Sequence, residues 1–471
     1  MATHRPCERR RRLAATTTTP QTNKKRKTDG PTSSRITLPD DLIVEVLVRL
    51  PARSLARLRC AGRSWDAEIS SRGFQERHHV LAAAAAPKFA FLPPAIPHTV
   101  FTEAWFPRSR GPGLLPLTCR PCPRVVTPKP CRGVVLIARP CSAAATFSLA
   151  NPTTGEVLHV PSSRHKFGGP ASLVTGIGFD AAAGEYKLVQ VSVELESLHA
   201  RVLTVGDERG WRAAAGNPPA NSFGFTQHAG IDVHIQPVFA DGCLHWSFKT
   251  DRRYIDMPHG IVSFSLAGES FRRAPQPPFS TADLVPYDFQ EHPPYHAQLL
   301  RGCLGKRSGS DEEVAAPAGT ALAELDGRLC MMRDVRHRGD VGGLFEVWRL
   351  HDYEAGSWSL DCRIELTPGR MADRLTTPWL VVPLRYLDDG GAPGAKRKLL
   401  LATSEQEAHV YDPDTATLLT VAAVSAPADL NDSLRLVMYH ESLVRFAGMK
   451  QAKDKILCNL SDGYKRLDYS Q

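Results

Sequence analysis

The sequence predicts a multidomain chain in which a small all-α unit is followed by a large all-β domain. The chain has 471 residues, about three times the ~150 residues of a typical domain. Its 37 prolines and 35 glycines favour short strands and turns over long helices. Helical spacing of apolar residues is confined to a segment that begins near residue 40, and short apolar runs separated by turn residues follow it.

Residues 1–35 are expected to form a disordered basic tail. They hold ten Lys and Arg residues against two acidic ones, so most of the net charge of +9 lies here. They have no hydrophobic periodicity and cannot bury enough apolar area to offset chain entropy. The cluster Lys24, Lys25, Arg26 and Lys27, preceded by Arg9–Arg12, is typical of a nuclear-import signal and predicts a protein of the nucleus and cytoplasm. A solubilising tail and an organelle transit peptide are the alternatives.

The rest of the chain is nearly neutral, which indicates a protein partner and no nucleic acid, because phosphate binding requires concentrated positive charge. No apolar run approaches the ~18 residues of a membrane span, so no membrane partner is expected. The eleven cysteines form no compact framework and the N-terminus lacks an apolar signal segment. They are interpreted as reduced thiols of a soluble intracellular protein.

The segment 36–80 is expected to form three short helices. Apolar residues at three- and four-residue spacing predict the first over 40–50, with acidic residues in its first turn. Pro51 ends this helix and begins a second, which carries Leu55 and Leu58 on one face. Trp65 and Ile69 indicate the third. So small a core is hard to stabilise alone, and the unit is therefore expected to bind a partner.

The segment resembles the F-box in Leu38–Leu42, Arg49–Leu55, Arg57–Trp65 and Phe74. It departs from the family at residues 61–63, Ala-Gly-Arg, where a Val-Cys-Lys run is usual. The resemblance implies that the unit binds a Skp-type adaptor and, through it, a cullin. The implied adaptor-binding surface consists of apolar residues and prolines: Leu38, Pro39, Leu42, Val46, Leu50, Pro51, Leu55 and Leu58.

Residues 81–88 are interpreted as a linker, and residues 89–471 as one β-propeller-like domain. Asn or Asp opens a tight turn after a strand in Asn151–Glu156, Asp180–Glu185 and Asp412–Thr417, where its side chain can bond the backbone two residues on. Repeated four-stranded units explain this recurrence most simply. Closing them into a ring would shield the strand edges.

Two further turns support the repeat. Asp241-Gly242 and Asp326-Gly327 stand between apolar runs and predict tight hairpins. They lie 85 residues apart, close to twice the ~40–50 residues of a propeller blade, which predicts that they are two blades apart.

The β-region also resembles the F-box-associated, kelch-like region of plant F-box proteins. The matching segments are Asn151–Glu156, Gly178–Asp180, Tyr186–Val189, Gly242–Trp246, Val347-Trp348, Asp352–Glu354 and Trp358. Together the two resemblances imply the substrate-recognition subunit of a Skp–cullin–F-box ubiquitin ligase, whose β-domain binds an unknown target protein. The alternatives are a kelch-like enzyme or small-molecule sensor with a ligand at its blade loops, and an adaptor-bound regulator without a degradative role.

No catalytic motif is complete, so no enzyme activity, cofactor or metal is expected. Gly305-Lys306 lacks the Ser or Thr of a phosphate-binding loop, and Gly176-Ile177-Gly178 lacks the third glycine of a dinucleotide motif. Four cysteines could supply zinc thiolates, but the second pair lacks the usual spacing. These cysteines are Cys119, Cys122, Cys131 and Cys141.

Overall fold

A computed structural model gives the arrangement of the chain. It describes residues 39–93, 99–100, 117–118, 124–127, 129–139, 146–161, 163, 173–194, 197–216, 237–248, 260–275, 277–278, 320–336, 343–366, 373–376, 378, 380–388, 396–425, 434–452, 457–460 and 466–468. The chain divides into two compact units, residues 1–46 and 47–471.

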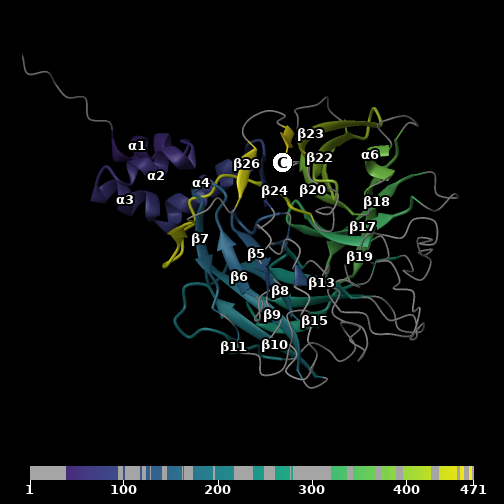
Figure 1. The fold of residues 1–471 in the computed structure, drawn as a ribbon, viewed down its shortest axis with the longest axis horizontal. Helices are drawn as coiled ribbons and strands as arrows, with labels where there is room; N and C mark the ends of the chain where they lie inside the picture. The colour runs from purple at the N-terminus through teal and green to yellow at the C-terminus, as the bar shows by residue number, and fades with distance from the viewer. Residues whose placement is uncertain are drawn as a thin grey trace, which may run out of the picture. The chain divides into compact units, whose positions relative to one another are not determined.

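Within the described residues, four helices precede the first strand of the β-domain (Figure 1). They are α1 (Asp40–Leu47), α2 (Ala52–Leu58), α3 (Arg63–Ser70) and α4 (Arg72–Ala84). Helix α1 ends at Leu47 and is shorter than predicted, and in the turn that leads to Pro51 the Leu50 amide donates to the Leu47 carbonyl oxygen at 2.9 Å. The fourth helix was not predicted. It begins because the Ser71 hydroxyl accepts a hydrogen bond from the Phe74 amide at 3.2 Å, which caps α4.

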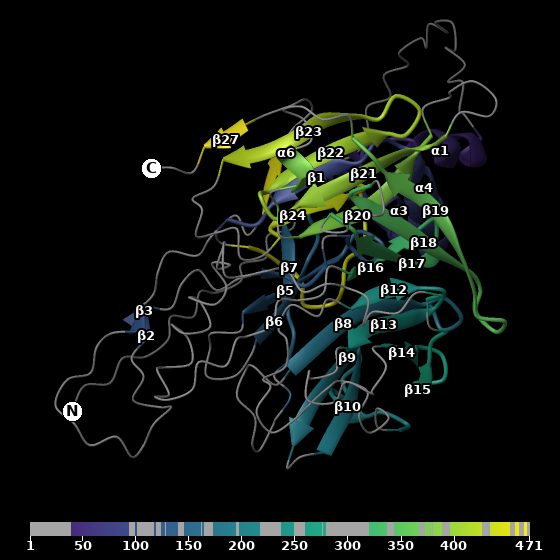
Figure 2. The same ribbon diagram turned by 90° about the vertical axis from the view of Figure 1, so that its right-hand side faces the viewer.

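Five sheets of four or five strands make up most of the β-domain (Figures 1 and 2). Sheet 1 contains β4 (Arg124–Val125), β5 (Val135–Arg139), β6 (Thr146–Ala150), β7 (Glu156–His159) and β25 (Lys450–Gln451). Sheet 2 contains β8 (Leu173–Asp180), β9 (Glu185–Glu194), β10 (Ser197–Thr204) and β11 (Arg212–Ala213). Sheet 3 contains β12 (Val238–Ala240), β13 (Cys243–Phe248), β14 (Gly260–Ser265) and β15 (Ser270–Arg273).

The other two large sheets follow in chain order. Sheet 4 contains β16 (Thr320–Leu325), β17 (Arg328–Asp334), β18 (Phe345–Asp352) and β19 (Ser357–Ile364). Sheet 5 contains β20 (Val381–Leu387), β21 (Lys398–Thr403), β22 (Glu407–Asp412), β23 (Thr417–Ser425) and β27 (Arg466–Asp468). The short helix α6 (Asp373–Thr376) precedes β20, and β2 (Thr99–Val100) pairs with β3 (Leu117–Thr118).

A three-stranded closing sheet joins the two ends of the β-domain. It consists of β24 (Leu436–Tyr439), β1 (Lys88–Phe91) and β26 (Cys458–Leu460) in that order. Strand β1 follows the helices, yet it pairs with β24 from Lys88 opposite Tyr439 to Phe91 opposite Leu436. Figure 2 shows β1 and β24 among the strands of the C-terminal part of the chain.

Buried apolar clusters connect each sheet to the next and complete a ring. One side chain from each partner illustrates each contact: Leu136 and Leu188 for sheets 1 and 2, Val191 and Phe264 for 2 and 3, Ile261 and Leu329 for 3 and 4, Phe345 and Leu399 for 4 and 5, Leu400 and Phe91 for 5 and the closing sheet, and Val437 and Ile137 for the closing sheet and sheet 1. The order returns to its start, which confirms the predicted β-propeller-like fold.

The predicted turns form with the expected chemistry. Oδ1 of Asn151, Asp180 and Asp412 accepts a hydrogen bond from the amide two residues on, at 2.9, 3.1 and 3.0 Å respectively. Both Asp-Gly pairs connect adjacent strands, and all four of their residues have φ between +48° and +81°, as a two-residue hairpin of type I′ requires.

The predicted separation of the two Asp-Gly hairpins was wrong. Asp241-Gly242 joins β12 to β13 and Asp326-Gly327 joins β16 to β17, so they belong to neighbouring sheets 3 and 4. The long connection between Arg273 and Thr320 accounts for the extra sequence spacing.

Candidate functional site

Helix α1 carries an exposed apolar surface. Pro39 is exposed and its carbonyl accepts from the amides of Leu42 and Ile43 at 3.0 and 3.1 Å, which starts the helix. Leu42 and Val46, one helical turn apart, are 51% and 59% exposed. Because residues four apart lie on the same face of a helix, Leu42 and Val46 form one exposed apolar surface.

Helix α2 turns part of its apolar surface inward. Leu55 is completely buried, Leu50 and Leu58 are half-buried, and Pro51 is exposed. Leu55 is therefore part of the interior in this structure and is not exposed for direct contact with a partner. The remaining predicted contact, Leu38, lies outside the described residues.

The interior of the helices also holds a buried histidine. His78 of α4 is 4% exposed, and its Nε2 lies 3.2 Å from the carbonyl oxygen of Leu50. Burial lowers the pKa of His78, so the neutral ring is favoured. Ile69 and Phe74 are buried as well. The contact between His78 and Leu50 ties α4 to the segment that leads into α2.

Charged side chains of the β-domain contact α2 and α4. Oε2 of Glu441, which follows β24, accepts from the Ala52 amide at 2.7 Å, and its Oε1 accepts from Lys88 Nζ at 2.6 Å. Arg132, between β4 and β5, pairs with Glu76 of α4. Sequence reasoning missed these residues, because Glu441 is 389 positions from Ala52 and no local pattern marks it.

A second ion pair joins opposite sides of the ring. Lys129, between β4 and β5, pairs with the Glu324 carboxylate and donates to the Glu324 carbonyl oxygen at 3.2 Å. These residues belong to sheets 1 and 4, which are opposite one another in the cyclic order of six sheets. Arg132, which pairs with Glu76 of α4, belongs to the same β4–β5 connection as Lys129.

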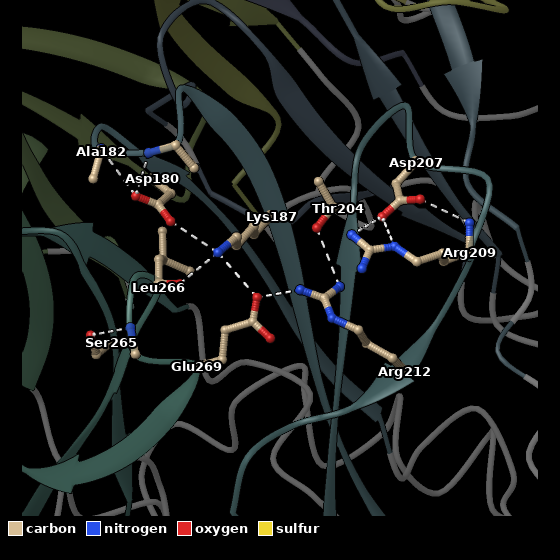
Figure 3. Close-up of polar contacts among 12 residues, drawn as sticks. Asp180, Ala182, Lys187, Thr204, Asp207, Arg209, Arg212, Ser265, Leu266 and Glu269 are labelled. Carbon is tan, nitrogen blue, oxygen red and sulfur yellow. Dashed lines mark hydrogen bonds and ion pairs between the residues drawn. The ribbon is translucent and has the colours of Figure 1, made fainter.

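Figure 3 shows a polar network between sheets 2 and 3. Lys187 Nζ lies 2.9 Å from Asp180 Oδ2, 2.8 Å from the Leu266 carbonyl oxygen and 3.0 Å from Glu269 Oε1. Glu269 also pairs with Arg212. The hydrogen bond from Lys187 holds the pKa of Asp180 below its usual value.

This network is better suited to joining two sheets than to binding a ligand. Two cations face two carboxylates, so its formal charge cancels, and the Lys187 ammonium has three acceptors for its three protons. A buried ion pair of this kind holds its partners in a defined geometry, and loss of one partner leaves an uncompensated charge.

The other candidate residues predicted from the sequence have these placements. No group of three His, Cys, Asp or Glu that could hold a metal occurs among the described residues. Cys131 is a buried free thiol whose pKa burial raises to about 12, and Cys119, Cys122 and Cys141 lie outside the described residues.

The Lys24 to Lys27 cluster and Gly305-Lys306 also lie outside the described residues. In the described part, no helix has the length and apolar character needed to cross a membrane.

The chain is similar in sequence to F-box proteins of Arabidopsis thaliana. One is 30% identical over 262 residues, covering 50% of this chain and 56% of the relative. Another is 23% identical over 356 residues, covering 70% of this chain and 76% of the relative. An F-box/LRR-repeat protein is 24% identical, covering 52% of this chain and 56% of its own length. For two other Arabidopsis relatives, 24% and 40% identical, the match covers 81% and 16% of the relative's length respectively.

No protein-family model matches the chain. Among solved structures, TolB from Acinetobacter baumannii is 12% identical with a TM-score of 0.33, covering 79% of this chain and 73% of TolB. A chain of a nidogen/laminin complex is 11% identical, also with a TM-score of 0.33, and the match covers 76% of this chain and all of that one. These scores are too low to support an argument.

Proposed function

Because this chain belongs to the plant F-box proteins, we propose that it is the substrate-recognition subunit of a Skp–cullin–F-box ubiquitin ligase. The helices would bind a Skp-type adaptor, and through it a cullin, while the β-domain would bind a target protein. The observation that supports this proposal best is the exposed apolar pair Leu42 and Val46, carried by a helix that precedes a large β-domain.

The described residues of the predicted adaptor surface divide into three classes by exposure. Pro39, Leu42, Val46 and Pro51 are exposed and are proposed as direct contacts. Leu50 and Leu58 are half-buried and would contribute at the edge of the surface. Leu38 is proposed as a further contact, on the F-box resemblance alone. Leu55 is proposed to support α2 from inside.

The test is adaptor co-purification with paired variants. Replacing Leu42 and Val46 together with Ala keeps helix propensity and is expected to lower adaptor affinity at least about tenfold, since apolar anchors dominate interfaces. Replacing Leu38 and Pro39 with Ala is expected to have the same effect. The matched control is Leu419→Ala in β23, a leucine that is 65% exposed in the β-domain. Full adaptor binding by both double variants would contradict the proposal.

The target is proposed to bind the end of the ring that faces away from α2 and α4. Glu441 and Arg132 contact the helices, and Lys129, in the same β4–β5 connection as Arg132, pairs with Glu324. A target bound at the far end would leave these contacts intact. In this mechanism the chain itself supplies no catalytic group. It would hold the target near the ubiquitin-carrying E2 enzyme, which raises the effective concentration of the target and orients it.

Proximity labelling with and without proteasome inhibition identifies the partners. Recovery of adaptor and cullin, with labelled proteins that accumulate under inhibition, is the expected result. Recovery of adaptor and cullin without such accumulation would support the regulator without a degradative role. Absence of both, together with small-molecule binding by the purified chain, would support the sensor or enzyme alternative.

A further inference from the structure

We propose that Glu441 is a positioning residue that fixes helices α2 to α4 in one orientation on the β-domain. The purpose of this coupling, presenting a target at a fixed distance from the adaptor, depends on the proposed function. The coupling itself does not, because all of its contacts lie within this chain.

The first argument is the backbone geometry at the start of α2. Pro51 stands at the position before the helix, with φ −56° and ψ 140°, and makes no side-chain hydrogen bond to the first turn. Ala52 is fully buried, so water cannot easily satisfy its amide. The Glu441 carboxylate accepts that amide at 2.7 Å, in the role that an Asp or Ser side chain usually has at a helix start.

The second argument is that Glu441 makes contacts on two elements at once. Its other carboxylate oxygen accepts from Nζ of Lys88, the first residue of β1, at 2.6 Å. The Glu441 side chain is 19% exposed and that of Lys88 is 41% exposed. Burial alone would raise the pKa of Glu441, but the hydrogen bonds from Lys88 and the Ala52 amide outweigh it and lower that pKa. Glu441 is therefore charged at neutral pH and joins α2, β1 and the segment after β24.

The third argument is that two other parts of the ring hold the same helices. Arg132 pairs with Glu76 of α4, and its guanidinium carbon lies 4.2 Å from the centroid of the Phe179 ring. At Gly184, between β8 and β9, a Cβ atom would clash with the guanidinium of Arg72. Three separate segments of the β-domain thus contact α2 and α4, through Glu441, Arg132 and Gly184.

Among these three contacts, Glu441 is expected to matter most. The Arg132 to Glu76 pair involves a Glu76 side chain that is 49% exposed, and ion pairs this exposed contribute little. Glu441 instead satisfies a buried backbone amide with a charged acceptor, which is the stronger kind of hydrogen bond. Its loss would also leave the Ala52 amide without that acceptor.

Distance distributions between two spin labels test the inference in the full chain. The labels are attached to ketone-bearing amino acids at two exposed positions, Glu68 of α3 and Thr415 of the β22–β23 turn. Ketone chemistry leaves the native cysteines unlabelled. We expect a narrow distribution in the parent chain and one about twofold broader in Glu441→Ala, since removal of a fixed contact permits hinge motion. Lys88→Ala keeps the bond to Ala52 and should have a smaller effect.

The matched control is Glu407→Ala. Glu407 has nearly the same side-chain exposure as Glu441, 20% against 19%, and its ion pair is with Arg374 of α6. Its replacement should leave the distribution unchanged. If Glu441→Ala does not fold, Glu441→Met decides the question by the same measurement, because it keeps a long side chain but has no oxygen to accept from the Ala52 amide or Lys88.

Two results would overturn the inference. One is a folded Glu441→Ala or Glu441→Met chain whose distribution is as narrow as that of the parent. The other is a broad distribution in the parent chain itself. Adaptor affinity is measured in parallel, and loss of adaptor binding by the parent chain would refute the proposed function without affecting the distance result.

Discussion

Asn151 provides the most direct test of whether the ring of sheets is one cooperative structure. Its side chain is 1% exposed and lies in the turn between β6 and β7 of sheet 1. Nδ2 donates to the carbonyl oxygens of Ser442 and Val444 at 3.0 and 2.9 Å, and Oδ1 accepts from the Thr153 amide at 2.9 Å. One side chain thus ties the first sheet to the segment that follows β24.

Replacing Asn151 with Ala removes all three hydrogen bonds. Each buried bond contributes about 1 kcal/mol net, and carbonyl groups left without a partner add to the loss, so we expect the free energy of unfolding to fall by about 3–4 kcal/mol. That is a large fraction of the roughly 5–15 kcal/mol that stabilises a typical domain. Because the bonds connect the first sheet to a segment about 290 residues later in the chain, where the ring closes, the whole β-domain should lose stability together.

Asn151→Asp provides a nearly isosteric comparison. The new carboxyl could still accept from Thr153, but its second oxygen would face the carbonyl oxygens of Ser442 and Val444. Burial and this repulsion would raise its pKa in the folded state above the unfolded value of about 3.9. The variant should therefore be least stable at neutral pH, and its deficit relative to the parent should shrink as pH falls and the carboxyl becomes protonated.

The assay is urea unfolding followed by both circular dichroism and tryptophan fluorescence. Asp412→Ala is the control, because Asp412 makes the same turn bond at 3.0 Å but pairs with Lys398 inside its own sheet 5. It should cost only about 1 kcal/mol. The reasoning is refuted if Asn151→Ala costs no more than the control, or if the two probes report separate transitions for two halves of the ring.

Three further predictions concern pH, ring closure and localisation. His245 is fully buried, and burial lowers its pKa to about 4. As pH falls from the unfolded pKa near 6.5 to 4, the free energy of unfolding should therefore fall by up to ~1.4 kcal/mol per pH unit. His245→Phe should flatten that pH dependence in thermal unfolding, and an unchanged slope would contradict this role. Deleting residues 400–471 removes β24 and should destabilise the entire β-domain, whereas a stable fragment ending near residue 280 in limited proteolysis would show that its halves fold separately. Changing Lys24 to Lys27 to Ala in a fluorescent fusion should shift signal to the cytoplasm, and an unchanged distribution would favour the solubilising-tail interpretation.

Local chemistry in the sequence was sufficient to predict the first three helices and the tight turns, but not α4. The apolar spacing from Leu42 onward predicts α1 because helical neighbours lie three and four residues apart. Asp241-Gly242 predicts a hairpin because few other pairs tolerate positive φ at both positions. In each case the residues that determine the structure are adjacent in the chain, so their own conformational preferences decide it.

Tertiary structure alone decided which of these residues face inward and which distant segments meet. Leu55 belongs to the same apolar pattern as Leu42, yet Leu55 is buried and Leu42 is half exposed. The pairing of β1 with β24 and the acceptance of the Ala52 amide by Glu441 join residues hundreds of positions apart. A contact of that kind depends on the path of the whole intervening chain, and no short sequence pattern encodes that path.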